Sequence, residues 1–229
     1  WVALGPGSGH PLLDYCDAAS LMAAADAMVE TGLVAAGYRT FHLDDCWAGS
    51  RNASGHLVPE VAHFPNGMEP VIRYANARNI SFGLYTDRGN ETCVAGRPGS
   101  LGHFRQDAEL FAAWGVDWVK MVREACPPPH HCTNPHRPQD KCNSPGDGEV
   151  EAEKVAYAAM SRALNASGRH MHFNYCGDSG KAWLWADEYM QSWRSGNDHT
   201  GTWGAPTGTK VIIETASAEI PAKFSGKPF

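Results

Sequence analysis

Apolar side chains recur at helical spacing in several segments of the chain, and each segment is followed by a short apolar run. The helical period is clearest in residues 18–37, and the run at 40–43 that follows ends in two aspartates. A period near 3.6 predicts an amphipathic helix, whereas a bounded apolar run of about four to eight residues predicts a strand. The predicted helices are 18–37, 69–78, 103–114, 151–165 and a stretch around Trp183. The predicted strands are 40–43, 81–85, 117–121, 170–176 and 189–194.

The alternation of helices and strands predicts an α/β fold with parallel strands joined by right-handed crossovers. Polar or charged residues follow every predicted strand, which is where a (β/α)8 TIM barrel carries its active site. No Gly-rich phosphate loop follows an early strand, and this disfavours an open dinucleotide-binding sheet. Eight strand-helix units need about 250 residues. Five strands in 229 residues therefore predict an incomplete barrel, with one partial domain over 1–229.

One segment breaks the alternation. Residues 127–148 contain six prolines and no apolar periodicity, so we expect a long Pro-rich loop insertion. A loop of this length in a compact domain is usually functional or disordered, and an error in the reading frame is a further explanation.

Zinc-type ligands gather in and beside this loop. Their spacing matches no zinc module, and the chain has no CxxC pair. We therefore favour a loop that is disordered or tied by a disulfide, and we predict no metal site. The ligand-type residues are Cys126, His130, His131, Cys132, His136 and Cys142.

Charge and cysteine content indicate which partners and which cellular location to expect. The net charge is -6, and charges of both signs are scattered in short mixed runs, so neither nucleic acid nor membrane is an expected partner. Seven cysteines without a CxxC pair favour structural disulfides. Four Asn-x-Ser/Thr sequons agree with a secreted, lysosomal or vacuolar location. The sequons begin at Asn52, Asn79, Asn90 and Asn165.

Four blocks of the sequence match one known family, in its order and near its spacing. They read FHLDDCWAGSRNASGHLVPEVAHFPNG, SFGLYTDRGNETC, PGSLGHFRQDAELFAAWGVDWVK and SWRSGND. On these blocks the chain resembles the α-galactosidase and α-N-acetylgalactosaminidase family, glycoside hydrolase family 27. The resemblance implies a (β/α)8 barrel followed by a β-sandwich, and removal of terminal α-linked galactose or N-acetylgalactosamine with retention of configuration.

The sequence departs from the family pattern at both ends. WVALGPGSGHPLLDYC stands where relatives have an opening strand with a GWNSW-like motif, and the chain stops at KPF, before their WND-x-DML motif. We therefore expect about five of the eight barrel strands, and no β-sandwich.

Retaining glycosidases use two carboxyl groups about 5 to 5.5 Å apart. By resemblance, Asp198 is the acid/base and Arg194 binds the sugar near its 2-hydroxyl; the alternative for Asp198 is a helix cap. Relatives read KxDxC at the end of the fourth barrel strand, which is the predicted strand 117–121 here. Here direct alignment puts Val122 at the nucleophile position, and a two-residue insertion puts Glu124 there. Two residues advance a strand by roughly 6.6 Å, so Glu124 needs a bulge or bent loop to act, and a solvated Glu is the alternative.

The resemblance also supplies substrate-binding residues. Asp44 and Asp45 match paired carboxylates that accept hydrogen bonds from galactose hydroxyls, and Tyr85 and Lys120 match further sugar contacts. A helix cap and a salt-bridge partner are the alternatives for the aspartates, and packing is the alternative for Tyr85. Relatives read Glu-Trp after the cysteine where this chain has Gly177-Asp178, which removes the cue that separates galactose from N-acetylgalactosamine.

Two disulfides are implied by the same resemblance. Cys16 and Cys46 match a pair that joins the first helix to a strand end, and Cys93 pairs most readily with Cys126. Cys132, Cys142 and Cys176 remain, so at least one thiol is free or has its partner outside this sequence.

The predicted function is retaining hydrolysis of terminal α-galactosides on oligosaccharides or glycoconjugates, without metal or organic cofactor. The intact protein could form a homodimer. The alternatives are α-N-acetylgalactosaminidase specificity, a barrel that binds galactosides without cleaving them, and a mispredicted fragment. Because the nucleophile position is altered, we expect hydrolysis by the 229-residue chain itself to be absent or very weak.

Overall fold

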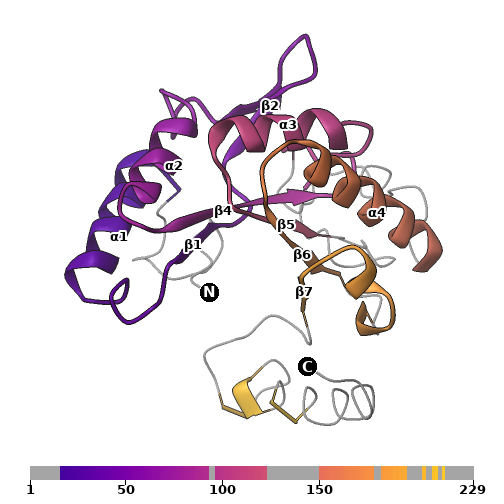
Figure 1. Cartoon of the computed structure of the whole chain (residues 1–229). Coiled ribbons are helices and arrows are strands. Elements are labelled where there is room, and N and C mark those ends of the chain that lie inside the picture. The colour runs from indigo at the N-terminus through magenta and orange to yellow at the C-terminus, as the bar shows by residue number, and fades with distance from the viewer. Residues whose placement is uncertain are drawn as a thin grey trace.

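The computed structural model describes residues 16–92, 96–122, 150–177 and 182–194, with the short pieces 203–204, 208–210 and 213–214. Its main feature is a five-stranded parallel sheet in the order β1-β4-β5-β6-β7. Figure 1 shows the strands fanning across the molecule beneath the helices. The strands are β1 Thr40–Leu43, β4 Ser81–Asp87, β5 Trp118–Val122, β6 His172–Cys176 and β7 Ser192–Trp193. The five predicted strands are therefore confirmed.

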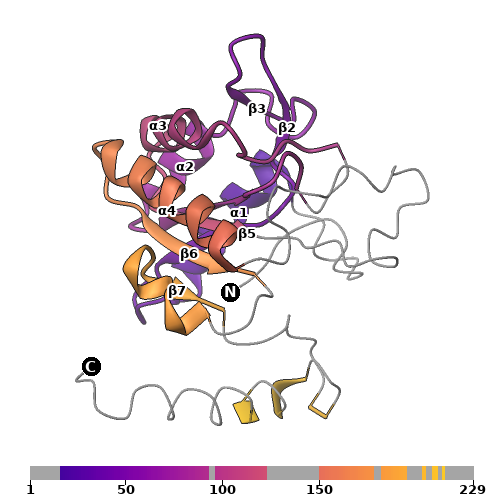
Figure 2. The ribbon, with the colours of Figure 1, turned by 90° about the vertical axis from the view of Figure 1, so that its right-hand side faces the viewer.

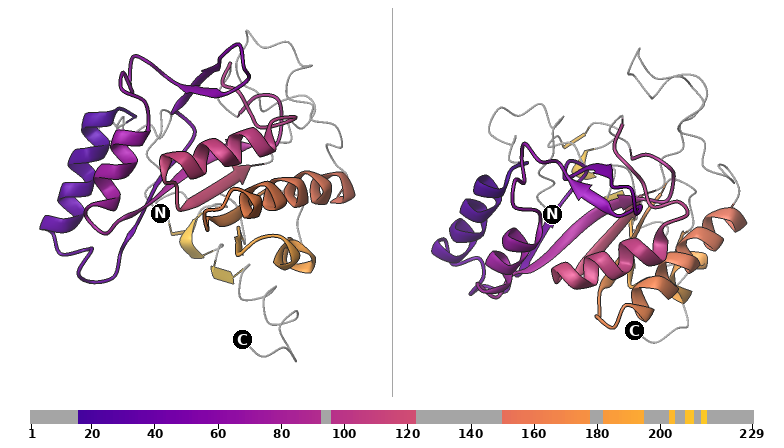
Figure 3. Two further views of the ribbon diagram at one scale, coloured as in Figure 1. Left: turned by 45° about the horizontal axis from the view of Figure 1, so that its top comes forward. Right: turned by 90° about the horizontal axis from the view of Figure 1, so that it is seen from above.

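The order of the strands distinguishes the two parallel folds that the alternation allowed. In a doubly wound sheet the order reverses at a switch point, and helices cover both faces. Here the spatial order follows the chain without reversal, and the helices of neighbouring units pack against one another, α1 on α2, α2 on α3 and α3 on α4. Figures 1 and 3 show these helices along one side of the sheet. This is the arrangement of part of a (β/α)8 barrel.

Four α-helices of the described residues alternate with the strands: α1 Ala18–Glu30, α2 Glu69–Asn76, α3 Phe104–Trp114 and α4 Val150–Ala166. Asp17 caps α1, because its carboxylate accepts from the Ser20 backbone N–H at 2.9 Å. Gly115 ends α3 in the left-handed conformation at φ 84°. The prediction of a helix to residue 37 was wrong: α1 ends at Glu30, and turns follow in which Gly32 and Gly37 have positive φ.

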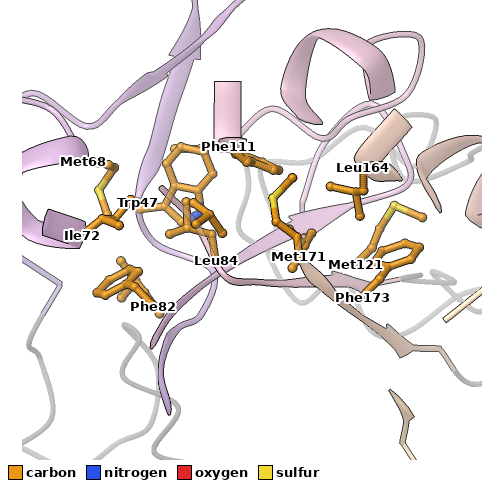
Figure 4. Close-up of a cluster of buried hydrophobic side chains, with 14 of the residues drawn as sticks. Trp47, Met68, Ile72, Phe82, Leu84, Phe111, Met121, Leu164, Met171 and Phe173 are labelled. Carbon is orange, nitrogen blue, oxygen red and sulfur yellow. The ribbon is translucent and has the colours of Figure 1, made fainter. Parts of the chain in front are cut away.

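The core lies between the helices and the sheet face that they cover. Successive residues of a strand point to opposite faces. On the longer strands the residues of one parity are buried, and all of them except Thr86 are apolar or aromatic. Figure 4 shows these side chains meeting the inner sides of the helices. The labelled members are Trp47, Met68, Ile72, Phe82, Leu84, Phe111, Met121, Leu164, Met171 and Phe173.

Two features of the described chain were not predicted. A β-hairpin, β2 Ala48–Arg51 with β3 Leu57–Pro59, projects between β1 and α2, and Figure 2 shows it standing above the sheet. The predicted helix around Trp183 is two short 3-10 turns, η1 Ala182–Leu184 and η2 Ala186–Glu188. No helix of the described residues has the length and apolarity to cross a membrane.

The predicted disulfide between Cys16 and Cys46 is confirmed, with Cα atoms 6.2 Å apart. Both cysteines are buried, and the bond ties the residue before α1 to the segment that follows β1. It closes a loop of 30 residues.

Replacing both cysteines by serine should lower the free energy of unfolding by about 3 kcal/mol, because the unfolded chain regains the freedom that the closed loop removes. Urea unfolding of the oxidised protein and of the double variant measures the difference. Coincident unfolding midpoints would contradict the expected contribution.

Candidate functional site at the carboxyl ends of the strands

The sheet face away from the helices carries polar side chains in layers. The register places Tyr85, Lys120, Asn174 and Ser192 side by side across four strands. One layer nearer the carboxyl ends, Asp87, Val122 and Cys176 are in register. One layer nearer the amino ends, the corresponding residues are His42, Gly83, Trp118 and His172. Side chains that point inward from several parallel strands fill the interior of a barrel, and the carboxyl end of that interior carries the active site.

Three of the predicted substrate-binding residues are brought together at this end. Lys120 Nζ lies 2.7 Å from Asp44 Oδ2 and 5.3 Å from the centre of the Tyr85 ring. The side chains of Lys120 and Asp44 are 15% and 19% exposed, so the ion pair is largely but not fully removed from water. Residues from β4, β5 and the end of β1, far apart in sequence, thus form one polar cluster, which we call the lysine cluster.

Local contacts fix the members of the lysine cluster. Asp44 Oδ1 accepts from the Asp45 backbone N–H at 2.9 Å, which leaves Oδ2 directed to Lys120. Trp47 is fully buried and donates from Nε1 to the Tyr85 carbonyl at 2.9 Å. The LDDCW segment therefore holds both the carboxylate and the strand that carries Tyr85. Asp45 itself is half-buried beside Asp44.

Arg194 lies at the same end, after β7. Its Nη1 is 3.3 Å from Cys176 Sγ, and Cys176 packs with Tyr85 and Val122 in a small buried cluster. Contacts therefore lead from Arg194 to Tyr85 and on to Lys120. We expected six residues to converge at this end: Asp44, Asp45, Tyr85, Lys120, Arg194 and Asp198. The structure brings Asp44, Tyr85, Lys120 and Arg194 together through these contacts.

Val122 occupies the last position of β5 on the inner face. It is 8% exposed and packs with Tyr85 and Cys176, and its carbonyl accepts from the Arg88 backbone N–H at 3.0 Å. The position that direct alignment assigns to the nucleophile is therefore an apolar side chain in a formed strand. The other catalytic predictions, Glu124 and Asp198, lie outside the described residues, as do Cys93, Cys126, the loop 127–148 and Asp178.

Several inner-face residues of the site were missed by the sequence reading. Asn174 donates from Nδ2 to Ser192 Oγ at 2.8 Å, and His172 Nε2 lies 2.7 Å from the same oxygen. Trp118 stacks on His172 with ring centres 3.5 Å apart. Trp118 could have been found because it is two residues before Lys120 and so points to the same face. The same alternation on the next strand, β6, indicates His172 and Asn174.

His42 and Gly83 form the floor beneath Asp44. His42 is buried on β1, two residues before Asp44, and is in register with Gly83 on β4. A Cβ at Gly83 would lie 2.2 Å from His42 Nδ1. Because Gly83 has no side chain, it leaves the space that the His42 imidazole occupies.

Gly83→Ala should lower the free energy of unfolding by about 1 to 3 kcal/mol, because the added methyl group overpacks the floor. Gly204→Ala is the control, because a Cβ at Gly204 would meet no atom within 4 Å among the described residues. Thermal unfolding of both variants is the measurement. Equal melting temperatures for Gly83→Ala and the unmodified chain would contradict the contact.

The floor histidine should also make stability depend on pH. Burial lowers the pKa of His42 from 6.5 to about 3; the Asp44 carboxylate raises it and the Lys120 ammonium lowers it. Because the unfolded chain takes up this proton first, stability should fall as pH drops from about 6.5 towards 3, and recover fully above 6.5. The His42→Asn variant should lose this part of the slope. Chemical unfolding at a series of pH values tests this, and identical slopes for both proteins would exclude a buried neutral His42.

Gly177 stands where the family resemblance implies a Glu, and its surroundings explain why a residue without a side chain fits there. A Cβ at Gly177 would lie 2.5 Å from Tyr175 Oη and 2.9 Å from Glu153 Oε1. Glu153 is buried and accepts from Tyr175 Oη at 3.0 Å. The buried carboxylate of α4 and the tyrosine hydroxyl thus fill the volume that a side chain at 177 would need in this backbone.

A buried ion pair fixes the rim above the site. Arg51 of the hairpin donates from both terminal nitrogens to the two carboxylate oxygens of Asp107, at 2.8 and 2.6 Å, and Asp107 is fully buried. The same guanidinium donates to the carbonyls of Gly55 and Gly99 at 2.6 and 2.7 Å. Arg51 therefore joins the hairpin, the β4–α3 loop and the first turn of α3, and we call this set of contacts the rim clamp.

Known proteins resemble this chain over most of its length. Residues 14–136 match the family model described as Alpha galactosidase A. Alpha-galactosidase A of Cellvibrio japonicus is 39% identical over 82% of this chain and 41% of its own length. Alpha-galactosidase of Coffea arabica is 39% identical over 80% of this chain and 43% of its own length. The chain thus spans about two fifths of the curated relatives that it matches.

Solved structures give the same result. The α-galactosidase of Saccharomyces cerevisiae with raffinose superposes with a TM-score of 0.71 at 33% identity, over 83% of this chain and 39% of that one. The α-galactosidase I of Mortierella vinacea superposes with a TM-score of 0.73 at 26% identity, over 92% of this chain and 53% of that one. Motifs, strand order, the lysine cluster and these matches lead to one conclusion: the chain belongs to the α-galactosidase family, glycoside hydrolase family 27.

Proposed function

We propose that the protein of which this chain forms part hydrolyses terminal α-linked galactosides and retains the anomeric configuration. The observation that carries the proposal is the lysine cluster. Its carboxylate and ammonium are fixed by an ion pair of 2.7 Å at the carboxyl ends of β1 and β5, the two parallel strands on either side of β4, in a chain whose relatives are α-galactosidases.

The lysine cluster suits recognition of a neutral sugar. Hydroxyl groups both donate and accept hydrogen bonds, so a fixed carboxylate beside a fixed ammonium can bind a particular pair of them. In this proposal Asp44 and Asp45 accept from galactose hydroxyls, Lys120 donates, and Tyr85 covers one side of the ring. An epimer would leave one of these groups unpaired, which costs more than the lost hydrogen bond alone.

The chemical step needs two carboxyl groups, and we assign them to Asp198 and Glu124. Asp198 would protonate the departing oxygen and then activate water, while Glu124 would attack the anomeric carbon. Neutral Val122 cannot attack. The nearest carboxyl that follows it in the chain is Glu124, and this is the reason for the assignment. The roles require no metal ion and no organic cofactor.

One observation favours a second function, binding without cleavage. Val122 is packed and apolar at the end of β5, where the family resemblance implies a nucleophile. A protein with the lysine cluster but no carboxylate near this position would hold galactosides intact. The assay described next also measures whether the protein prefers galactose or N-acetylgalactosamine.

The test measures hydrolysis of aryl α-galactoside and aryl α-N-acetylgalactosaminide by the full-length protein and by this chain, with folding checked by circular dichroism. We expect the full-length protein to prefer the galactoside. Asp198→Ala should lower its kcat by about 100- to 10,000-fold, and Glu124→Gln should abolish turnover. We expect at most weak turnover from the 229-residue chain, and Val122→Asp tests whether a carboxylate at that position restores it. Galactoside binding without turnover in the full-length protein would favour the second function, and the absence of both would contradict either one.

The remaining assignments follow from the same proposal. The Cys16–Cys46 disulfide and the four sequons support a secreted, lysosomal or vacuolar protein, since disulfides persist in oxidising compartments. The partner is a carbohydrate substrate. Pairing of Cys93 with Cys126, the single partial barrel domain over 1–229 and a homodimer of the intact protein stay predictions.

A further inference from the structure

The end of the barrel opposite the site carries an apolar patch on residues 29–38. Val29, Leu33 and Tyr38 are 45%, 42% and 67% exposed. The chain turns back on itself here, because the Tyr38 backbone N–H donates to the Leu33 carbonyl at 2.9 Å. Three large apolar side chains from one short segment thus face water, and we call them the basal patch. Exposed apolar side chains promote association unless something covers them.

A sequon lies beside the basal patch. Asn79 is exposed in the turn between α2 and β4, and Ser81, the third residue of the sequon, begins β4. Ser81 is in register with Thr40, and its backbone N–H donates to the Arg39 carbonyl at 2.7 Å. Tyr38 and Asn79 therefore lie one and two residues before two hydrogen-bonded residues, Arg39 and Ser81. Figure 3 shows α1 and α2 side by side where the two turns follow them.

The backbone presents Asn79 outward. Its φ is 61°, the left-handed conformation that asparagine adopts more readily than most residues. Within the described residues the Asn79 side chain has no hydrogen bond or ion pair, whereas the Asn52 carbonyl oxygen already accepts from two backbone N–H groups at 3.0 Å. Ile80 between the two sequon residues is buried and anchors the turn.

We propose that Asn79 carries an N-linked glycan that covers the basal patch. The inference rests on the proposed passage through the secretory pathway. The Asn79 amide nitrogen attacks the anomeric carbon of an N-acetylglucosamine in a lipid diphosphate-linked oligosaccharide. A C–N bond forms, the C–O bond to the diphosphate breaks, and the lipid diphosphate leaves with that oxygen while a base of the host transferase takes the amide proton.

A glycan at Asn79 would lie at the end of the barrel opposite the proposed sugar-binding site. Asn79 precedes β4, whereas the lysine cluster lies where β4 and β5 end. A bulky polar modification at the amino end of the strands leaves the carboxyl end open to substrate. It also replaces exposed apolar surface with hydrated sugar in the same region.

The experiment secretes the full chain from a eukaryotic host behind a cleavable leader. Glycans are removed enzymatically in heavy-oxygen water, so that each glycosylated asparagine is marked as a heavy aspartate in peptide mass spectra. We expect the mark at Asn79. A mark at Asn165, an exposed sequon asparagine in the last turn of α4, without one at Asn79 would overturn this proposal alone. No mark at any sequon would overturn this proposal and would also remove the support that the sequons give to the secretory location.

Matched variants test the covering role. Ser81→Ala removes the sequon but keeps Asn79 in its left-handed turn, and Ser81→Thr retains the sequon. Ser81→Ala should bind an apolar fluorescent dye at least about twofold more than Ser81→Thr, and Tyr38→Ser in the Ser81→Ala background should reverse the increase. Asn165→Gln should leave dye binding unchanged. Equal dye binding by Ser81→Ala and Ser81→Thr would show that the glycan does not cover the basal patch.

Discussion

Replacement of Lys120 by Met should weaken the binding of galactose on the order of 100-fold, because removal of one partner from a largely buried, hydrogen-bonded charge pair costs about 2 to 5 kcal/mol. Lys120 contacts both Asp44 and the Tyr85 ring, so the variant loses the donor that we propose for the sugar and leaves the Asp44 carboxylate without its cation. Isothermal titration of the folded chain with galactose measures the change.

Lys154→Met is the matched control for this loss. Lys154 also makes a 2.7 Å ion pair, with Glu151 on α4, but the two side chains are 30% and 80% exposed. Exposed pairs contribute little, and this one lies on a helix and not on the inner face. Galactose binding should be unchanged in the control. Equal binding by Lys120→Met and the unmodified chain would contradict the assignment of the lysine cluster to the sugar.

Arg51→Met should lower the free energy of unfolding by about 3 to 5 kcal/mol, the largest stability effect that we expect of a single substitution. The substitution leaves the Asp107 carboxylate buried without its bidentate partner, which costs far more than the net contribution of the intact pair. It also removes hydrogen bonds to two carbonyls of the rim. Urea unfolding gives the magnitude.

Two controls separate the buried charge from the loss of a surface arginine. Arg105 and Glu109, on the same helix as Asp107, form an ion pair at 2.8 Å with side chains 86% and 55% exposed, so Arg105→Met should cost less than about 1 kcal/mol. Arg51→Met combined with Asp107→Leu should recover part of the loss, because no charge stays buried. If both single arginine variants were equally stable, the rim clamp would have no special role.

The fold could be predicted to a large extent because its main signals are local. Each strand is an apolar run after a helical period, and the observed strand starts lie close to the predicted ones. The β2–β3 hairpin was missed because strands of four and three residues give too short an alternation to read. The end of α1 was missed because Ala35 and Ala36 continue the apolar period after Gly32 has turned the chain.

The site could be predicted only where a charged side chain stands at the end of a predicted strand. Asp44 and Lys120 are charged residues at strand ends, and their 2.7 Å contact follows from parallel strands ending at one edge. His42 and Gly83 could not be paired from sequence, since a glycine gives no side-chain signal and the contact depends on the register of β1 with β4. The Arg51–Asp107 pair is similarly hidden, because its partners are separated by 56 residues.

The central claim is that this site belongs to a retaining α-galactosidase, and the most direct measurement is the anomer that it releases first. Raffinose is added to the full-length protein, and the anomeric proton of free galactose is followed by NMR before mutarotation mixes the two forms. We expect α-galactose to appear first, since two successive displacements at one carbon restore its configuration. β-Galactose as the first product, or no released galactose, would contradict it.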